Sequence, residues 1–338
     1  MDSDEKVSTF IQMGERSDAL QYVKSLSLTN LSEPHRILDT ISRKASLETL
    51  CLHRAEFHVE PLAASLLSRL STVTVLVLRE CRFGGFKDFV SFIRCFPLCE
   101  VLRLRACTWT RYKDAKLKFG GVRVHDIAPV HLEITNNFPM EQGEEYYDQG
   151  RIVGAAWLGL GGLKSFTYPF WGETATKLML ERIAACELLE EIDLDIPHSV
   201  RRSFGECEPC GCPILGLFNW LRSAISLLTP FLARIKSLTL RFEYGFLPLW
   251  VPYLDMDFPP SPTLERMRII IAWSMPIEEE FESLDSMFAD TNQYPSLKEF
   301  EVCSDVVTQE GKKGRDTYES LCMDEYLPRL KAMGKLPV

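Results

Sequence analysis

The chain has 338 residues, of which 46% are hydrophobic and 25% charged, and its formal net charge is −9. This composition is typical of a folded globular protein, and the acidic balance disfavours nucleic acid as a partner. The first twenty residues are rich in charge and contain no apolar run, so we expect no secretory signal. The most apolar stretch, 213–235, is interrupted by Asn219, Arg222 and Arg234, so we expect no membrane association. A cytoplasmic or nuclear protein with reduced cysteines is therefore predicted.

Residues 1–20 are predicted to form an amino-terminal helical cap or a partly disordered lead. A repeat region of about ten units is predicted for residues 21–315, and a carboxy-terminal cap or tail for 316–338. The clearest repeat has the form apolar-x-x-apolar-x-apolar-x-x-small and occurs three times at intervals of 26 residues, with another copy 24 residues upstream. These copies are Val23/Leu26/Leu28/Leu31, Leu47/Leu50/Leu52/Ala55, Val73/Leu76/Leu78/Cys81 and Cys99/Leu102/Leu104/Cys107.

Looser copies continue along the chain at irregular intervals, which indicates insertions near 136–162, 196–234 and 244–263. The looser copies are Ile127/Val130/Leu132, Leu163/Phe166/Tyr168, Leu189/Ile192/Leu194, Ile235/Leu238/Leu240, Leu264/Met267/Ile269 and Leu297/Phe300/Val302.

The spacing of the repeat predicts one short strand per unit, because side chains alternate between the two faces of an extended chain. Leu76 and Leu78 are expected to point inward, whereas Val75, Val77 and Arg79 are expected to point outward. Helical spacing follows in Phe86/Phe89/Val90/Ile93/Phe96 and in Ile277/Phe281/Leu284/Phe288. The predicted fold is therefore α/β: a leucine-rich-repeat solenoid with a curved parallel sheet, helices on its outer side, and irregular repeats with insertions.

Two cysteines occupy the position at which a leucine-rich repeat carries asparagine or cysteine, at the bend that leaves the strand. These are Cys81 and Cys107. A role as metal ligands or nucleophiles is the alternative, but we expect both thiols to be buried structural groups.

The segment Ala19–Leu28, followed by irregular repeats with proline and aromatic insertions, resembles the F-box and leucine-rich-repeat proteins of mushroom-forming fungi. The resemblance covers roughly residues 10 to 330. It implies a role in recognising substrates for a ubiquitin ligase. Members of this family carry an amino-terminal F-box that docks a Skp-type adaptor. Here the first repeat strand is predicted to begin near Val23, and no F-box fits before it. We therefore expect no direct binding of that adaptor, and the F-box could have been lost or truncated.

The insertions contain three further candidate features. The first insertion is acidic, with Glu141, Glu144, Glu145 and Asp148, and it ends in the glycine-rich run 154–162, whose glycines we interpret as turn residues.

The second insertion holds Cys207, Cys210 and Cys212, with His198 upstream. This cluster could bind zinc, be redox-active or simply carry unpaired thiols. A tetrahedral zinc site usually needs a second pair of ligands, which the sequence lacks, so we expect no stoichiometric zinc. The third insertion interleaves prolines with Phe246, Trp250, Tyr253, Met256 and Phe258, which could form a peptide-binding lip or pack against the solenoid.

The outward positions of the predicted sheet would form an extended concave surface. Charged candidates for protein binding there are Arg79, Arg103, Arg105, Glu191, Asp193, Asp195, Arg241, Arg266 and Arg268, joined by Trp250 and Tyr253 of the third insertion. His131, Glu133, Glu299 and Glu301 occupy outward positions too. Along the sequence the charges alternate in blocks, from basic to acidic, to basic and to acidic. Such blocks favour electrostatic choice of a partner, although a merely solvated face is the alternative.

These patterns favour a protein–protein interaction scaffold, with ligand sensing as the alternative. No Gly-x-Ser-x-Gly elbow is present and none of the six histidines lies in a catalytic motif, so we expect no enzymatic activity. The sequence predicts no cofactor, no metal and no catalytic residue.

Overall fold

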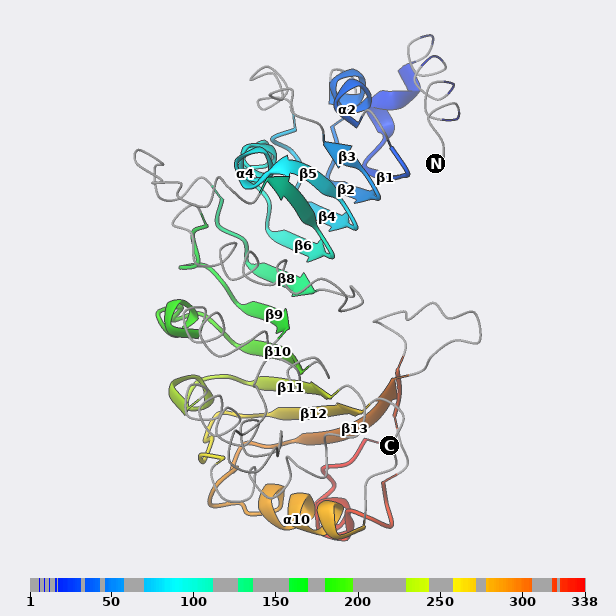
Figure 1. Ribbon diagram of the computed structural model, residues 1–338. Coiled ribbons are helices and arrows are strands. Elements are labelled where there is room, and N and C mark those ends of the chain that lie inside the picture. Colours follow the sequence, from blue (N-terminus) through cyan, green and yellow to red (C-terminus); the bar gives the residue numbers. More distant parts are fainter. Residues whose placement is uncertain are drawn as a thin grey trace, which may run out of the picture. The chain divides into compact units, whose positions relative to one another are not determined.

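The computed structural model describes the main part of the repeat region (Figure 1). The described residues are 6, 9, 12, 16, 18–31, 34–42, 46–57, 70–111, 127–135, 158–169, 180–196, 229–242, 258–271, 278–305, 318–320 and 323–337. The chain divides into two compact units, here called unit 1 (1–145 and 155–163) and unit 2 (146–154 and 164–338). Both are built on stacked parallel strands, so the predicted fold class, an α/β repeat solenoid, is confirmed.

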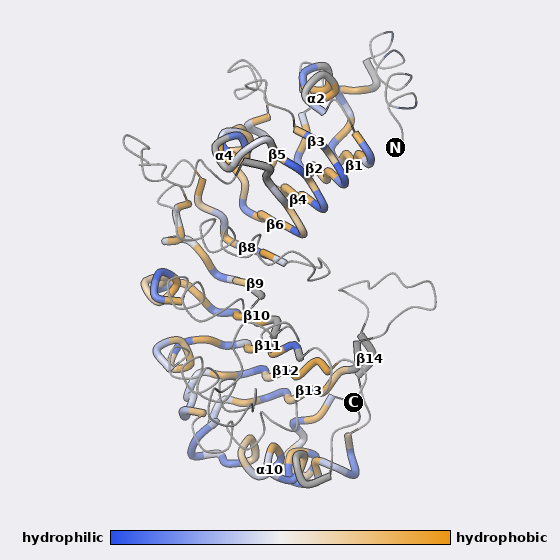
Figure 2. The backbone as a smooth tube through the Cα atoms, in the orientation of Figure 1, coloured by the Kyte–Doolittle hydropathy of each residue, from blue (hydrophilic) through white to orange (hydrophobic). Residues whose placement is uncertain are grey.

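The main sheet of unit 1 contains five parallel strands. They are β1 (Ser25–Thr29), β2 (Thr49–His53), β4 (Val75–Arg79), β6 (Val101–Arg105) and β8 (His131–Thr135). Their register places Leu26, Leu50, Leu76, Leu102 and Leu132 in one row and Leu28, Leu52, Leu78, Leu104 and Ile134 in a second row. Both rows are buried, and the hydropathy along β1 alternates accordingly (Figure 2). The predicted 26-residue repeat is thus the stacking interval of the strands.

The fifth strand corrects the predicted register by two residues. The sequence pattern aligned Val130 and Leu132 with the two inward positions, but the structure pairs Leu102 with Leu132 and Leu104 with Ile134. Because side chains alternate with a period of two, a shift of two residues keeps every residue on its predicted face. Ile127 instead forms an isolated parallel bridge with Leu158.

Four strands of unit 1 end in the same left-handed turn. Asn30, Arg54, Glu80 and Ala106 have φ angles of 57°, 55°, 52° and 53°. Each of their N–H groups donates to a carbonyl at the end of the next strand, with N···O distances of 2.7–2.9 Å. The left-handed conformation costs a residue with a side chain about 1–2 kcal/mol. The regular ladder of hydrogen bonds offsets this cost at each strand exit.

Beyond these turns the chain forms a second, smaller parallel sheet of β3 (Glu56–Phe57), β5 (Arg82–Gly85) and β7 (Thr108–Arg111). Helix α4 (Phe86–Ile93) packs on β5 and β7, and α2 (Pro34–Ser42) contacts β3. The core between them is aromatic: Phe83 stacks on Phe57 at 4.7 Å and meets Phe89 edge-on at 5.2 Å. The predicted helical face of Phe89, Val90, Ile93 and Phe96 is buried. A short 3-10 helix, η1 (Asp18–Tyr22), precedes β1.

The main sheet of unit 2 continues the same pattern. Its parallel strands are β9 (Ser165–Pro169), β10 (Glu191–Ile196), β11 (Ser237–Phe242), β12 (Arg266–Ile271) and β13 (Glu299–Asp305). The inward rows are Phe166/Ile192/Leu238/Met267/Phe300 and Tyr168/Leu194/Leu240/Ile269/Val302, in the predicted register. All ten residues are buried.

The edge of β13 is covered by the carboxy-terminal part of the chain. Strand β14 (Tyr318–Ser320) pairs antiparallel with the end of β13, and the N–H of Phe300 donates to the carbonyl of Lys335 at 2.7 Å. Helix α11 (Pro328–Ala332) packs on α10 (Glu278–Phe288). The buried carboxylate of Asp285 on α10 accepts the N–H groups of Arg329 and Leu330, each at 2.9 Å. This carboxylate therefore fixes the start of α11 to the solenoid.

Candidate protein-binding surface

The outward sheet face is formed by the side chains that alternate with the buried rows. In unit 1 its members are Ser25/Ser27/Thr29, Thr49/Cys51/His53, Val75/Val77/Arg79, Val101/Arg103/Arg105 and His131/Glu133/Thr135. In unit 2 they are Ser165/Thr167, Glu191/Asp193, Ser237/Thr239/Arg241, Arg266/Arg268/Ile270 and Glu299/Glu301/Cys303. The charged sheet residues proposed from the sequence thus lie on the predicted face, except Asp195, whose side chain is outside the described part of the structure.

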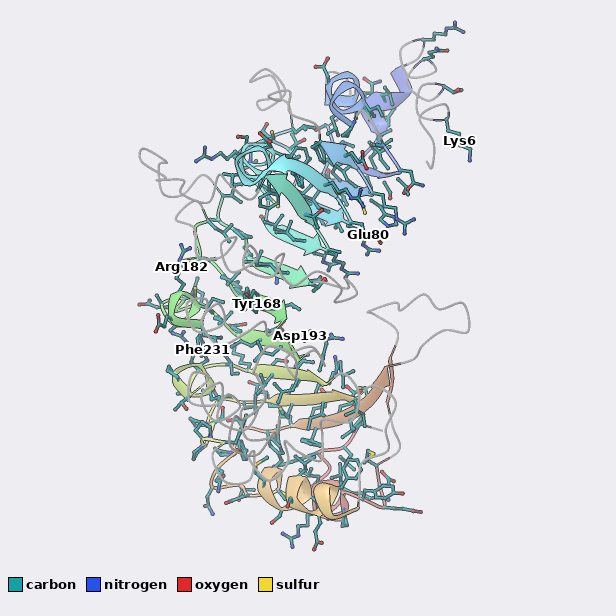
Figure 3. All side chains as sticks on the ribbon, in the orientation of Figure 1. Lys6, Glu80, Tyr168, Arg182, Asp193 and Phe231 are labelled. Atoms are coloured by element: carbon teal, nitrogen blue, oxygen red, sulfur yellow. The ribbon has the colours of Figure 1, made fainter. Side chains whose placement is uncertain are left out.

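The charges of unit 2 are compensated across strands. Arg241 on β11 binds Asp193 on β10 through two nitrogens, with a shortest distance of 2.7 Å. Asp193 on β10 is labelled in Figure 3. The guanidinium of Arg268 donates to the carboxylate of Glu301 on the neighbouring strand, to which it is opposite in register.

Arg266 completes this pattern with a longer contact of 3.3 Å to Glu191, which lies two strands away. The blocks of charge seen along the sequence therefore become pairs in space. Charges of like sign are grouped along the sequence, but opposite charges become neighbours in the structure because acidic and basic blocks of successive repeats lie on adjacent strands.

The charges on the outward face of unit 1 are neutralised less completely than those of unit 2. The five strands place three arginines and one carboxylate on the outward face. Glu133 is shared: its Oε1 accepts from Arg105 Nε at 2.7 Å and its Oε2 lies 3.4 Å from Arg103 Nε. Arg79 forms no ion pair within the described part of the chain, and its Nε is shielded from solvent without a hydrogen-bond partner. An excess of positive charge remains on β4 and β6.

A second polar cluster lies where β2 and β4 end. Glu80, labelled in Figure 3, accepts from Arg54 Nε at 2.7 Å and lies 3.1 Å from His53 Nε2. The pKa of the Glu80 carboxyl is lowered, chiefly by the hydrogen bond from Arg54; partial desolvation opposes this, and His53 adds to the lowering. Glu80 is thus paired with Arg54 and His53, and it forms no ion pair with Arg79.

Parts of the outward face are covered. Thr135, Ile270 and Cys303 occupy the outward positions near the ends of β8, β12 and β13, and all three are buried. The pattern Ile269–Ile271, three apolar residues in a row, breaks the alternation and could have revealed this from the sequence. The accessible surface is therefore concentrated on the first two outward positions of each of these strands.

Sequence reasoning also missed a charged ladder at the strand entries of unit 2. Its members are Lys164, Glu190, Lys236, Glu265 and Lys298. The carbonyl of each of the first four accepts two N–H groups from the start of the next strand. The ammonium of Lys236 lies 2.8 Å from Glu190, and that of Lys298 lies 2.8 Å from Glu265. All five residues follow the first apolar position of their repeat, so reading that variable position along the repeats would have found them.

The two cysteines of the repeat bend are buried, as predicted. Cys81 Sγ donates to the carbonyl of Leu52 at 3.5 Å, and Cys107 Sγ donates to that of Leu78 at 3.6 Å. Each thiol thus ties its bend to the preceding strand. The pKa of Cys107 is raised well above its usual value by its contact with Cys81 and by burial, so the thiol is held in its neutral form.

The other candidates fall mainly outside the described residues. Trp250 and Tyr253 lie there, as does the cluster of Cys207, Cys210, Cys212 and His198. Of the aromatic residues in the third insertion, Phe258 is described and buried. Its ring packs against Phe288 and Tyr294 with centroid distances of 6.1 and 6.5 Å. For this one residue, packing against the solenoid is the correct alternative.

None of the helices formed by the described residues is long and apolar enough to cross a membrane. Comparison with protein-family models gives no match, and no curated protein matches the chain.

Proposed function

We propose that the chain is a leucine-rich-repeat scaffold that binds another protein on its outward sheet face. The observation that carries the proposal is the strict register of the parallel strands, which arranges the outward side chains in columns about 4.8 Å apart. Such columns are rigid because their backbone is fixed by the sheet and by the buried rows beneath. A rigid surface loses little conformational entropy when a partner docks.

The composition of the face supports protein binding over a purely solvated role. The small polar Thr239 leaves room beside the larger Arg268, which is opposite to it in register, and the ion pairs of unit 2 hold Arg241 and Arg268 in fixed positions. Arginine is enriched at protein interfaces because its planar guanidinium binds carboxylates with defined geometry.

The resemblance of the Ala19–Leu28 segment and of the repeats to F-box and leucine-rich-repeat proteins suggests which task the scaffold performs. In that family the repeats recognise the substrate of a ubiquitin ligase, and we propose a related role here. All seven cysteines among the described residues carry free thiols, which supports a reducing compartment such as the cytoplasm or nucleus.

The proposal is tested by blocking the face without changing the core. Ser27→Tyr in unit 1 and Thr239→Tyr in unit 2 each place a bulky ring on the outward face, and Ala233→Tyr adds the same ring at an exposed position outside the sheet. Proteins captured by the wild-type chain from cells of its source are quantified by mass spectrometry for each variant. We expect at least one partner to be retained by Ala233→Tyr and lost with Ser27→Tyr or Thr239→Tyr. Identical capture by all variants would contradict the proposal.

A further inference from the structure

We infer that the outward face of unit 1 binds an acidic, partly apolar peptide segment of its partner, and that Arg79 is the anchor for a carboxylate of that segment. This inference rests on the proposed function and names the chemistry of the partner. It follows from the charge balance, the environment of Arg79 and the apolar side chains next to it.

The outward face of unit 1 carries more arginines than carboxylates. Arg79 and Arg105 are directly opposite in the parallel register of β4 and β6, which places two cationic side chains next to each other. Like charges in this arrangement destabilise a sheet unless a counter-charge is present. Glu133 supplies that counter-charge to Arg105, on the far side from β4. Arg79 is left beside the pair without a carboxylate of its own within the described residues.

The environment of Arg79 favours the binding of an anion. Its Nε is shielded from solvent and has no hydrogen-bond partner, which leaves a donor of a charged group unsatisfied. The histidine opposite it on β2, His53, is engaged by Glu80. An arginine held in this way offers the remaining donors of its planar guanidinium to an incoming carboxylate, with the geometry that suits a paired contact.

The neighbouring outward positions define the rest of the partner. Val75, Val77 and Val101 lie on β4 and β6 beside the arginines, and Cys51 lies opposite Val77 on β2. Val77 is buried and the other three are half-buried. The outward positions of β4 and β6 thus combine cationic and aliphatic side chains, which matches a segment that carries both acidic and apolar side chains. The net charge of −9 for the whole chain disfavours a long polyanion such as nucleic acid.

The test uses the full-length chain and a random peptide library displayed on phage. Peptides enriched on the wild-type protein are sequenced, synthesised and measured by fluorescence anisotropy against three variants. Arg79→Gln removes the proposed anchor, and Arg79→Lys keeps its charge without the planar fork. Arg82→Gln removes an equal charge from an exposed arginine of β5, in the smaller sheet. Thermal melting of each variant confirms that it is folded.

We expect enriched peptides to contain aspartate or glutamate beside apolar residues. Their Kd should rise at least about tenfold with Arg79→Gln, less with Arg79→Lys, and hardly with Arg82→Gln, since a hydrogen-bonded contact to a charged group is lost only in the first case. Enrichment of peptides without acidic residues, or equal binding by the folded Arg79→Gln and Arg82→Gln variants, would overturn the inference.

The two proposals fail in different ways. If enriched peptides ignore Arg79 but lose binding with Ser27→Tyr or Thr239→Tyr, the outward face is the binding surface and only the acidic partner is wrong. If neither Arg79→Gln nor either tyrosine variant affects the bound peptides, both proposals are wrong.

Discussion

Replacing Leu76 by alanine tests the stacking of the repeats directly. The Leu76 side chain is fully buried and lies between Leu50 and Leu102 in the inward row of unit 1. Truncation removes about three carbon atoms from the core, which at about 0.8 kcal/mol for each methylene amounts to roughly 2.4 kcal/mol. A residual cavity adds to this loss, because strands fixed on both sides cannot collapse into it. The expected total is about 3–5 kcal/mol.

The assay is urea denaturation monitored by far-ultraviolet circular dichroism, at a protein concentration at which unfolding is reversible. Leu98→Ala is the matched control, because that leucine precedes a strand of the same unit but its side chain is largely exposed. We expect the control to change the free energy of unfolding by less than about 0.5 kcal/mol. If Leu76→Ala were as mild as Leu98→Ala, Leu76 would lie outside a packed core and the repeat alignment would be wrong.

Four further predictions concern polar groups. Asp285→Asn should destabilise the chain by about 1.5–3 kcal/mol and speed amide exchange in α11, because one of two bound N–H groups would lose its charged acceptor. Tyr168→Phe should leave the melting temperature unchanged or raise it, because the buried hydroxyl (Figure 3) has no hydrogen-bond partner within the described residues. Arg105→Glu should lower the melting temperature, because it opposes Glu133 in a shielded position. Because the pKa of Glu80 is lower in the folded than in the unfolded state, its charge stabilises the fold fully above the unfolded pKa, and this stabilisation is lost as the pH falls through the folded pKa. Glu80→Gln should therefore make the free energy of unfolding depend less on pH during acidification.

Each of these predictions has an internal comparison. Ser286→Ala alters the next residue on α10 without removing the carboxylate, so equal exchange in α11 for both variants would contradict the role of Asp285. A large loss of stability in Tyr168→Phe would mean that its hydroxyl has a partner. Arg103→Glu is the control for Arg105→Glu, because the Arg103 side chain is 46% exposed and that of Arg105 only 13%. An unchanged acid profile in Glu80→Gln would show that other carboxylates dominate the response.

The buried rows could be predicted from the sequence because the leucine pattern reports directly on the period of a strand. Leu50, Leu76 and Leu102 recur at a fixed interval, and only one arrangement of parallel strands buries all three. The two-residue error at Leu132 arose because an alternating pattern is compatible with registers that differ by two. Only the hydrogen bonds of the strand decide between such registers.

The outward face could be located from the sequence, but its electrostatics could not. Arg241 and Asp193 are separated by 48 positions, and their contact depends on which strands become neighbours after the insertions. The same limitation applies to Arg105, which sequence reasoning treats as an exposed cation although Glu133 and the sheet enclose it. For an exposed cation a charge reversal would be nearly neutral, whereas the enclosed position of Arg105 predicts a loss of stability.

The covered edge of β13 has a consequence for how the protein behaves at high concentration. A stack of parallel strands ends in a row of free N–H and C=O groups, to which a strand of another molecule can add. Here β14 occupies the end of that row and Lys335 accepts the N–H of Phe300. An incoming strand would have to displace both contacts before it could extend the sheet. The carboxy-terminal segment thus caps this edge of the sheet and opposes the addition of further molecules into a fibre.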